Sequence, residues 1–184
     1  LISICGSEDA DITEKSESVE NTVNSSVEEP TIDLIPAVIE NDIDTVSQHI
    51  AYGSDLNVQD GTFSNTPLNF AGIYGLTDIA NALIDAGADL NLINDDNFTP
   101  LCNAAAWGHT SVVTILLDAG ADLSAKCFET QIGVSVSLSI AIGAPYSDYI
   151  KSLYVDHGEK YNIPYDETKI LEGREKVIEL LRSR

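Results

Sequence analysis

A period of 33 residues runs through the middle of this chain, and such a period constrains the fold more than any single residue does. Thr66-Pro67-Leu68 recurs as Thr99-Pro100-Leu101, and Asp85-Ala86-Gly87-Ala88-Asp89-Leu90 recurs as Asp118-Ala119-Gly120-Ala121-Asp122-Leu123. Both pairs have the same offset. We therefore expect an array of one short structural unit, in which each unit buries its apolar side against its neighbours.

Two less regular copies flank this pair. The first copy, from Leu34 to Asn57, repeats the apolar positions of the second at an offset of 34, because the second has one extra residue near Asp60. The last copy is degenerate, although Leu138-Ser139-Ile140-Ala141 and Asp156-His157-Gly158 still match the third copy after inserted residues. We expect it to fold less regularly. The four predicted repeats are 32–59, 60–93, 94–126 and 127–165.

Within each copy, the residues predict two short antiparallel helices and a protruding turn. Thr66 and Thr99 are suited to cap helices whose first position holds a proline, where a missing N–H has no cost. Glycine accepts the left-handed backbone that ends a helix, so the first helices should end near Gly75 and Gly108. The second helices carry apolar faces at helical spacing and should end at Gly87 and its later equivalent.

These residues resemble the ankyrin repeat, and the third copy matches its pattern in register. The matching positions are Thr99, Pro100, Leu101, Ala104, Ala105, Gly108, His109, Val113, Leu116, Leu117, Gly120, Ala121 and Asp122. The resemblance implies an all-α solenoid of about four helix-turn-helix repeats with β-turn fingers. The histidine that usually follows Thr-Pro-Leu is Asn69 in one copy and Cys102 in the next, which should weaken its usual bridging hydrogen bonds.

A C-terminal helix is expected to cover the last repeat. Ile170, Leu171, Arg174, Val177, Ile178 and Leu181 form one stripe at helical spacing, with charged residues on the other side. A solenoid needs such an element with one polar face, so we assign residues 166–184 to a capping helix. Gly173 should weaken this helix by about 1 kcal/mol relative to alanine.

The N-terminal residues 1–31 are acidic and poor in large apolar groups after Ile4, so we interpret them as a disordered tether. Leu1-Ile2-Ser3-Ile4-Cys5-Gly6-Ser7 is similar to the end of a bacterial lipoprotein signal, with Cys5 as the lipidated residue. This predicts a lipid-anchored protein of the cell envelope or periplasm, with Cys5 as its only membrane contact. The alternative is a trimmed cytoplasmic chain in which Cys5 is incidental.

The charge of the chain is strongly negative, with 30 acidic against 9 basic side chains. No Lys or Arg lies between Lys15 and Lys126, a gap that spans most of the repeats. Such a surface repels phosphate backbones, which excludes nucleic acid as an expected partner. A protein with a basic patch would instead be attracted. The alternative is that the acidic surface only aids solubility.

No arrangement of residues indicates catalysis, a cofactor or a metal site. His109 is expected to hold a turn, and Asn94-Asp95-Asp96-Asn97 is expected to be a solvated finger, because it lacks the ligand pattern of a calcium loop. Cys102 and Cys127 lie in adjacent repeats and could pair in an oxidising compartment, but the sequence cannot establish the needed separation of about 4.4–6.8 Å between their Cα atoms, so free thiols are the default expectation. An enzyme with an unrecognised site in 126–165, dependent on Asp148 or His157, is the alternative class, and a structural spacer is a third.

The resemblance implies a partner site on the concave face, formed by the turn tips and the first helices. Its predicted residues are Thr62, Phe63, Asn65, Ile73, Tyr74, Asp95, Asp96, Phe98 and Trp107. Trp107 and Tyr74 hold equivalent positions in adjacent repeats, and such aromatics are typical binding hot spots. Alternatively, they only shield the seam between repeats. We therefore expect a monomeric, non-catalytic protein-binding module, in one version an inhibitor or protector of an envelope enzyme or toxin.

Overall fold

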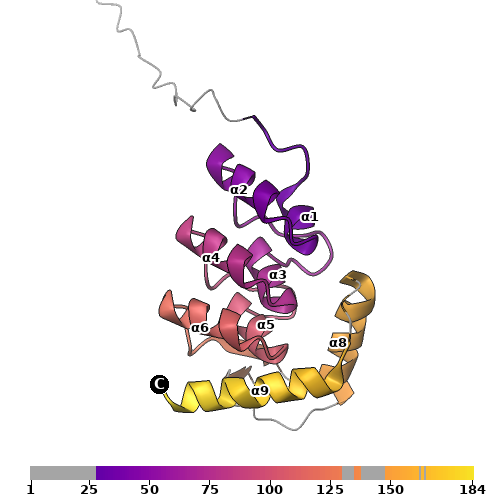
Figure 1. Cartoon of the computed structure of the whole chain (residues 1–184). Helices are drawn as coiled ribbons and strands as arrows, with labels where there is room; N and C mark the ends of the chain where they lie inside the picture. The colour runs from indigo at the N-terminus through magenta and orange to yellow at the C-terminus, as the bar shows by residue number, and fades with distance from the viewer. Residues whose placement is uncertain (1–27, 130–134, 138–147, 162, 164) are drawn as a thin grey trace, which may run out of the picture.

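The protein is an all-α repeat solenoid that carries one short β-ribbon. The computed structural model describes residues 28–129, 135–137, 148–161, 163 and 165–184. Three helix pairs stack on one another, and a long helix crosses the end of the stack (Figure 1). The paired helices are α1 (Leu34–Ile39), α2 (Ile43–Tyr52), α3 (Pro67–Tyr74), α4 (Thr77–Asp85), α5 (Pro100–Ala106) and α6 (Thr110–Asp118).

The first helices of the second and third repeats begin as the sequence predicts. The hydroxyl oxygen of Thr66 accepts a hydrogen bond from the backbone N–H of Asn69 at 3.1 Å, and Thr99 does the same for Cys102 at 3.2 Å. A proline follows each cap at the first helical position. After these helices the backbone turns left-handed at Gly75 and Gly108, with φ of 71° and 79°, which only glycine adopts readily.

Small residues let the first helices of neighbouring repeats approach closely. A Cβ atom on Gly72 of α3 would lie 2.8 Å from the carbonyl oxygen of Pro100 in α5. Ala71, Ala104 and Ala105 are fully buried beside this contact. Apolar side chains from all three repeats form one continuous core. The large side chains that are fully buried in it are Val38, Val46, Leu68, Phe70, Ile73, Ile79, Leu83, Leu101, Val112, Val113 and Leu116.

Beyond Ala125 the chain departs from the repeat pattern. Strands β1 (Lys126–Glu129) and β2 (Ser135–Ser137) pair antiparallel, with Lys126 opposite Ser137 and an irregularity before Phe128. The residues matched to a fourth first helix, Leu138–Ala141, lie outside the described part. Helix α8 (Asp148–Tyr161) continues through Gly158, so the expectation that Asp156-His157-Gly158 mirrors the helix end at Gly120 is wrong. Gly158 lacks the positive φ of that stop, and the helix gains another turn.

Helix α9 (Glu167–Arg182) packs across α5 and α6 and covers the end of the stack. Ile170, Arg174 and Val177 are buried, whereas Leu171 is 40% exposed, so the predicted apolar stripe is wrong at that position. The helix approaches the repeats at Gly173, where an added Cβ would overlap the carbonyl oxygen of Gly108. The sequence suggested only a weakened helix here, but the glycine permits a contact between two backbones.

Two different links replace the histidine that usually joins one repeat to the next. The amide group of Asn69 accepts a hydrogen bond from the Thr66 hydroxyl and donates one at 3.0 Å to the carbonyl oxygen of Phe98 in the next finger. At the equivalent position one repeat later, Cys102 forms a disulfide with Cys127, with 5.3 Å between the Cα atoms. The expectation of free thiols is therefore wrong, because β1 brings Cys127 within reach.

Candidate partner-binding surface

The finger of the second repeat is organised by a single carboxylate. Oδ1 of Asp60 accepts a hydrogen bond from the backbone N–H of Asn65 at 2.6 Å, and Oδ2 accepts one from Thr62 at 3.0 Å. In the third repeat an amide takes this role, because Oδ1 of Asn94 accepts hydrogen bonds from the backbone N–H groups of Phe98 and Asp96. Side chains of this type hold tight turns by bonding to nearby backbone, so both fingers have a defined shape.

An aromatic cluster lies between this finger and the first helix of the same repeat, and its central ring comes from α8. The ring of Tyr161 meets Phe70 edge-on at 5.0 Å between centroids and Phe63 at 6.0 Å. Its hydroxyl donates a hydrogen bond to Oδ2 of Asp60 at 2.9 Å. The hydroxyl of Tyr74 donates in turn to the backbone carbonyl of Tyr161, also at 2.9 Å. Such edge-to-face packing is favourable beyond the area it buries.

Both phenols in this cluster are proton donors at neutral pH. Burial raises the pKa of Tyr74 to about 12. Burial also raises the pKa of Tyr161, and the neighbouring Asp60 carboxylate contributes in the same direction because a phenolate there would face a like charge. The Tyr161 hydroxyl therefore keeps the proton that it donates to Asp60 at neutral pH.

The predicted partner residues do not form one exposed strip. Thr62 and Asp95 are exposed, whereas Phe63, Tyr74 and Asp96 are half-buried. The prediction of an accessible contact is wrong for the remaining four, which are buried in this conformation. These are Asn65, Ile73, Phe98 and Trp107.

The burial of each has a structural cause. Asn65 accepts a hydrogen bond from Nδ2 of Asn94 at 2.8 Å, between two fingers. Ile73 and Phe98 belong to the core that joins the repeats. Trp107, the C-cap of α5, is only 7% exposed and lines a cavity of about 400 Å³ together with Ile163 and Ile170. The C-terminal part of the chain thus covers the tryptophan that we expected to meet a partner.

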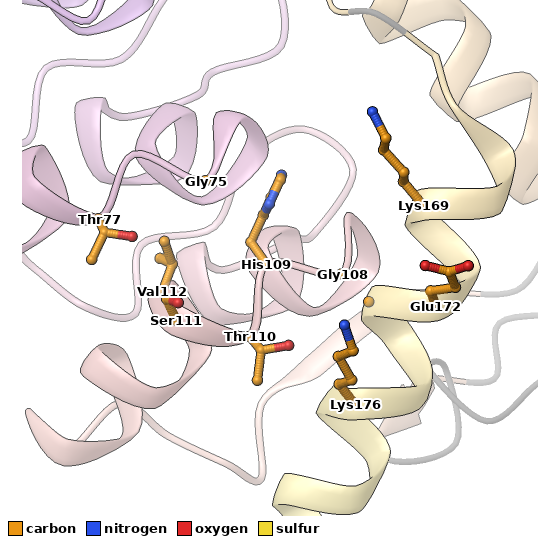
Figure 2. Close-up of a pocket in the computed structure, with 11 residues that line it drawn as sticks. Gly75, Thr77, Gly108, His109, Thr110, Ser111, Val112, Lys169, Glu172 and Lys176 are labelled. Carbon is orange, nitrogen blue, oxygen red and sulfur yellow. The ribbon is translucent and has the colours of Figure 1, made fainter.

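A second, open cavity of about 500 Å³ lies where α9 meets the turn before α6 (Figure 2). Lys169, Glu172 and Lys176 enter it from α9, and Thr110 and Ser111 face it from the first turn of α6. Lys169 pairs with Asp166 at 3.5 Å, and Glu172 offsets the remaining positive charge. The cavity is therefore a solvated junction of mixed charge.

His109, at the edge of both cavities, ties two repeats together. Its Nε2 lies 3.0 Å from the carbonyl oxygen of Ile73 in the preceding repeat, and its ring covers Gly75. Burial lowers the pKa of this imidazole, which the hydrogen bond to Ile73 partly opposes. With the ring neutral, Nε2 donates to that carbonyl. These contacts agree with the structural role that the sequence suggested for His109.

Sequence reasoning overlooked a row of exposed carboxylates, one per repeat, at Asp55, Asp89 and Asp122. Each accepts a hydrogen bond from the backbone N–H two residues further on. The repeats are linked along this row, because Asp89 donates its N–H to the side chain of Asn57 and Asp122 does so to Asn91. The recurrence of Gly-Ala-Asp could have revealed the row, but it was used only to set the period. We call these three residues the carboxylate row.

Among the described residues, no group of three or more His, Cys, Asp and Glu side chains is arranged to hold a metal ion. None of the helices in that part of the chain is long and apolar enough to span a membrane. Cys5 and the side chains of Asp148 and His157, which the lipid-anchor and enzyme hypotheses need, lie outside the description.

Comparison with known proteins agrees with an all-α repeat solenoid of stacked helix pairs. No curated protein matches the chain. A family model described as ankyrin repeats in three copies matches residues 34–127, just over half of the chain. Ankyrin repeats are generally protein–protein interaction modules and are typically non-catalytic. The matched segment contains the three helix pairs from α1 to α6, and the chain therefore belongs to the ankyrin repeat family.

Proposed function

We propose that this protein is a non-catalytic binding module that holds a partner protein through a basic patch on that partner. The observation that carries this proposal is the charge of the repeats. No Lys or Arg occurs between Lys15 and Lys126, and the exposed carboxylate row extends across all three repeats. Asp95 and Thr62 add polar contacts at the fingertips.

The carboxylate row is suited to attraction at a distance. Between Leu34 and Ala125 the sequence contains no Lys or Arg that could neutralise Asp55, Asp89 or Asp122. Charges of one sign on a surface speed the encounter with an oppositely charged partner, and the effect weakens as salt screens it. Rigid linkage of the row through Asn57 and Asn91 keeps the carboxylates in place before a partner arrives.

The disulfide supports a location in an oxidising compartment. Structural disulfides persist in the periplasm and outside the cell and are rare in the cytosol. Cys102 and Cys127 are both almost fully buried, so their link has the character of a structural bond. We therefore propose the cell envelope as the site of action, with Cys5 as a lipid anchor. Cys5→Ser in the full-length precursor should move the protein from the membrane fraction to the soluble fraction.

The test of the binding function compares two triple variants of equal charge. In one, the carboxylate row becomes Asn, whose side-chain oxygen can still hold each turn. In the other, Asp44 and Asp78 become Asn and Glu40 becomes Gln; all three are exposed, and none is close to the row in the sequence. Proteins retained by the immobilised wild type from cells of its source would be identified by mass spectrometry, and their affinities measured at low and high salt.

We expect a basic partner to be retained by the wild type and the control triple variant and lost by the row variant. Three charge contacts at a partially desolvated interface should weaken binding by about 1 to 3 kcal/mol in total at low salt, and by less at high salt. Equal affinity of the two triple variants, or retention that does not depend on salt, would show that the repeats do not use these carboxylates.

A further inference from the structure

The aromatic cluster around Tyr161 is divided between two parts of the chain in the way a receptor and its ligand would be. Asp60, Phe63, Phe70 and Tyr74, which receive the ring, all belong to the second repeat. Tyr161 comes from the end of α8, 101 residues away from Asp60 in sequence. The second repeat therefore offers an acceptor, two aromatic faces and a donor to one incoming tyrosine.

The receiving surface is held in shape by bonds that do not involve Tyr161. Asp60 is fixed by the backbone N–H groups of Asn65 and Thr62 within its own finger. Phe70 belongs to the core that joins the repeats, and Tyr74 stacks against it at 6.4 Å between ring centroids. Removal of Tyr161 should thus leave a preformed site and not a collapsed one, which favours the binding of another segment.

The contacts of α8 with the second repeat that the structure describes are those of Tyr161, at its C-terminal end. Among the described residues, no extensive helix-to-helix interface joins α8 to α3 or α5, whereas α9 packs broadly on α5 and α6. Figure 1 shows α8 standing beside the stack, with α9 across its end. Because Tyr161 belongs to the end of α8 and not to the helix pairs, its ring can leave the surface while the core of the repeats stays packed.

We propose that the last turn of α8 is an internal ligand: Tyr161 occupies the docking surface of the second repeat, and a partner takes its place with a tyrosine-bearing segment of its own. This deepens the proposed function and rests on it. The partner segment would donate its phenol to Asp60 and offer a backbone carbonyl to Tyr74. Since exposed Lys160 precedes Tyr161 in the internal ligand, a basic residue beside the partner's tyrosine suits the acidic repeats.

Because Tyr161 occupies the surface of the second repeat, a partner segment must bind tightly enough to displace it. A segment tethered within the same chain is present at an effective concentration in the millimolar range for short flexible links. An external segment at micromolar concentration therefore competes poorly while Tyr161 is in place. Loss of the Tyr161 ring removes this competition, so the occupied and vacated surfaces should differ clearly in affinity for the same probe.

The experiment uses the full chain and a labelled synthetic peptide of residues 155–163, in which Tyr161 is the one tyrosine, as the external probe, followed by fluorescence anisotropy. The chains are wild type, Tyr161→Ala, Tyr161→Phe and, as a matched control, Tyr52→Ala, whose tyrosine is exposed on α2. A second peptide carries alanine in place of Tyr161. Circular dichroism reports whether each variant is folded. Asp60 is left unchanged, because its loss would also disturb the finger.

We expect the tyrosine peptide to bind the Tyr161→Ala chain at least about tenfold more tightly than the wild type or the Tyr52→Ala control. The alanine peptide should bind none of the chains. Tyr161→Phe keeps the ring and loses one hydrogen bond, so it should raise peptide affinity by only about two- to tenfold. If Tyr161→Ala proves unfolded, this conservative variant still decides the question.

Equal affinity for wild type and the folded Tyr161 variants, binding of the alanine peptide, or no binding to Tyr161→Ala up to millimolar concentration would each overturn the internal ligand. These outcomes can be separated from a failure of the proposed function. The carboxylate-row comparison depends on charge and leaves Tyr161 unchanged. If the row variant loses its partner and the peptide experiment fails, the proposed function therefore stands and only the proposal of an internal ligand is rejected.

Discussion

The regular repeats between Leu34 and Ala125 and the segment from Lys126 to Arg184 are stabilised in different ways. In the repeats, each helix contacts its neighbour in sequence or its equivalent in the next repeat, and the same few residue types recur at each contact. In the C-terminal segment, α9 packs on α5 and α6, and contacts between residues far apart in sequence fix the position of the segment: Tyr161 with Asp60, Gly173 with Gly108, and Arg184 with Asp118 at 2.7 Å. A repeat pattern therefore determines the first region, whereas the second depends on contacts that no period describes.

The largest expected effect is on the free energy of unfolding, and it distinguishes the buried core of the repeats from an exposed position on α9. Leu83→Ala, in the fully buried core of α4, should lower the free energy of unfolding by about 2 to 5 kcal/mol, because it leaves a cavity between repeats. Leu171→Ala on α9, a leucine that is 40% exposed, should change it by less than about 0.5 kcal/mol. Urea denaturation measures both. Equal effects would mean that α9 is buried differently from the description.

The disulfide should give the next effect, because it fastens the second region to the first. Cys102→Ala with Cys127→Ala opens a loop with a sequence separation of 25 residues. On the chain-entropy view this should lower the free energy of unfolding by about 3 kcal/mol. A reducing agent should have the same effect on the wild type and none on the double variant. If a reducing agent leaves the free energy of unfolding of the wild type unchanged, the stabilising role of the disulfide is contradicted.

The contact between Gly108 and Gly173 tests the cap directly. Alanine is a better helix former than glycine by about 1 kcal/mol, so sequence alone predicts that Gly173→Ala stabilises α9. In the structure the new Cβ would meet the Gly108 carbonyl, and such overpacking should instead cost about 1 to 3 kcal/mol. Glu175→Ala, at an exposed position of the same helix, is the control. A more stable Gly173→Ala protein would place α9 elsewhere.

The smallest expected effect is the change of stability with pH that His109, which links two repeats, should cause. Because burial lowers the pKa of His109 below the ordinary value of about 6.5, the unfolded chain binds a proton before the folded chain does. Stability should therefore fall as the pH drops below about 6.5, by no more than about 1.4 kcal/mol per pH unit for one proton. Chemical denaturation between pH 7 and 5 measures this slope. His109→Gln should reduce it, and an unchanged slope would assign the titration to another group.

The repeat region could be predicted closely because its rules are local. The caps at Thr66 and Thr99, the small residues that let α3 meet α5, and the glycines after these two helices all follow from the character of single residues in a known period. The pairing of Cys102 with Cys127 could not be predicted, because it depends on where β1 lies. The sequence identifies two cysteines in adjacent repeats but gives no distance between them.

The partner site was predicted less well, and the reason is physical. A repeat register tells which side chains point away from their own helix pair, but it cannot tell what else covers them. Trp107 and Tyr74 hold the expected positions, yet Ile163 and α9 line the cavity at the first, and Tyr161 bonds to the second. Inserted residues before α8 hide this packing, because they destroy the period on which the prediction depends.

The central claim is that the end of α8 occupies a surface of the second repeat, and nuclear Overhauser effects between aromatic rings test it most directly. With 5.0 Å between the ring centroids of Tyr161 and Phe70, edge protons of the two rings should give clear cross-peaks in the full-length protein, and Tyr161→Ala should abolish them. If the Tyr161 ring shows no cross-peaks to Phe70 or Phe63 and its shifts are those of an unstructured tyrosine, α8 does not occupy the repeat surface and the account is contradicted.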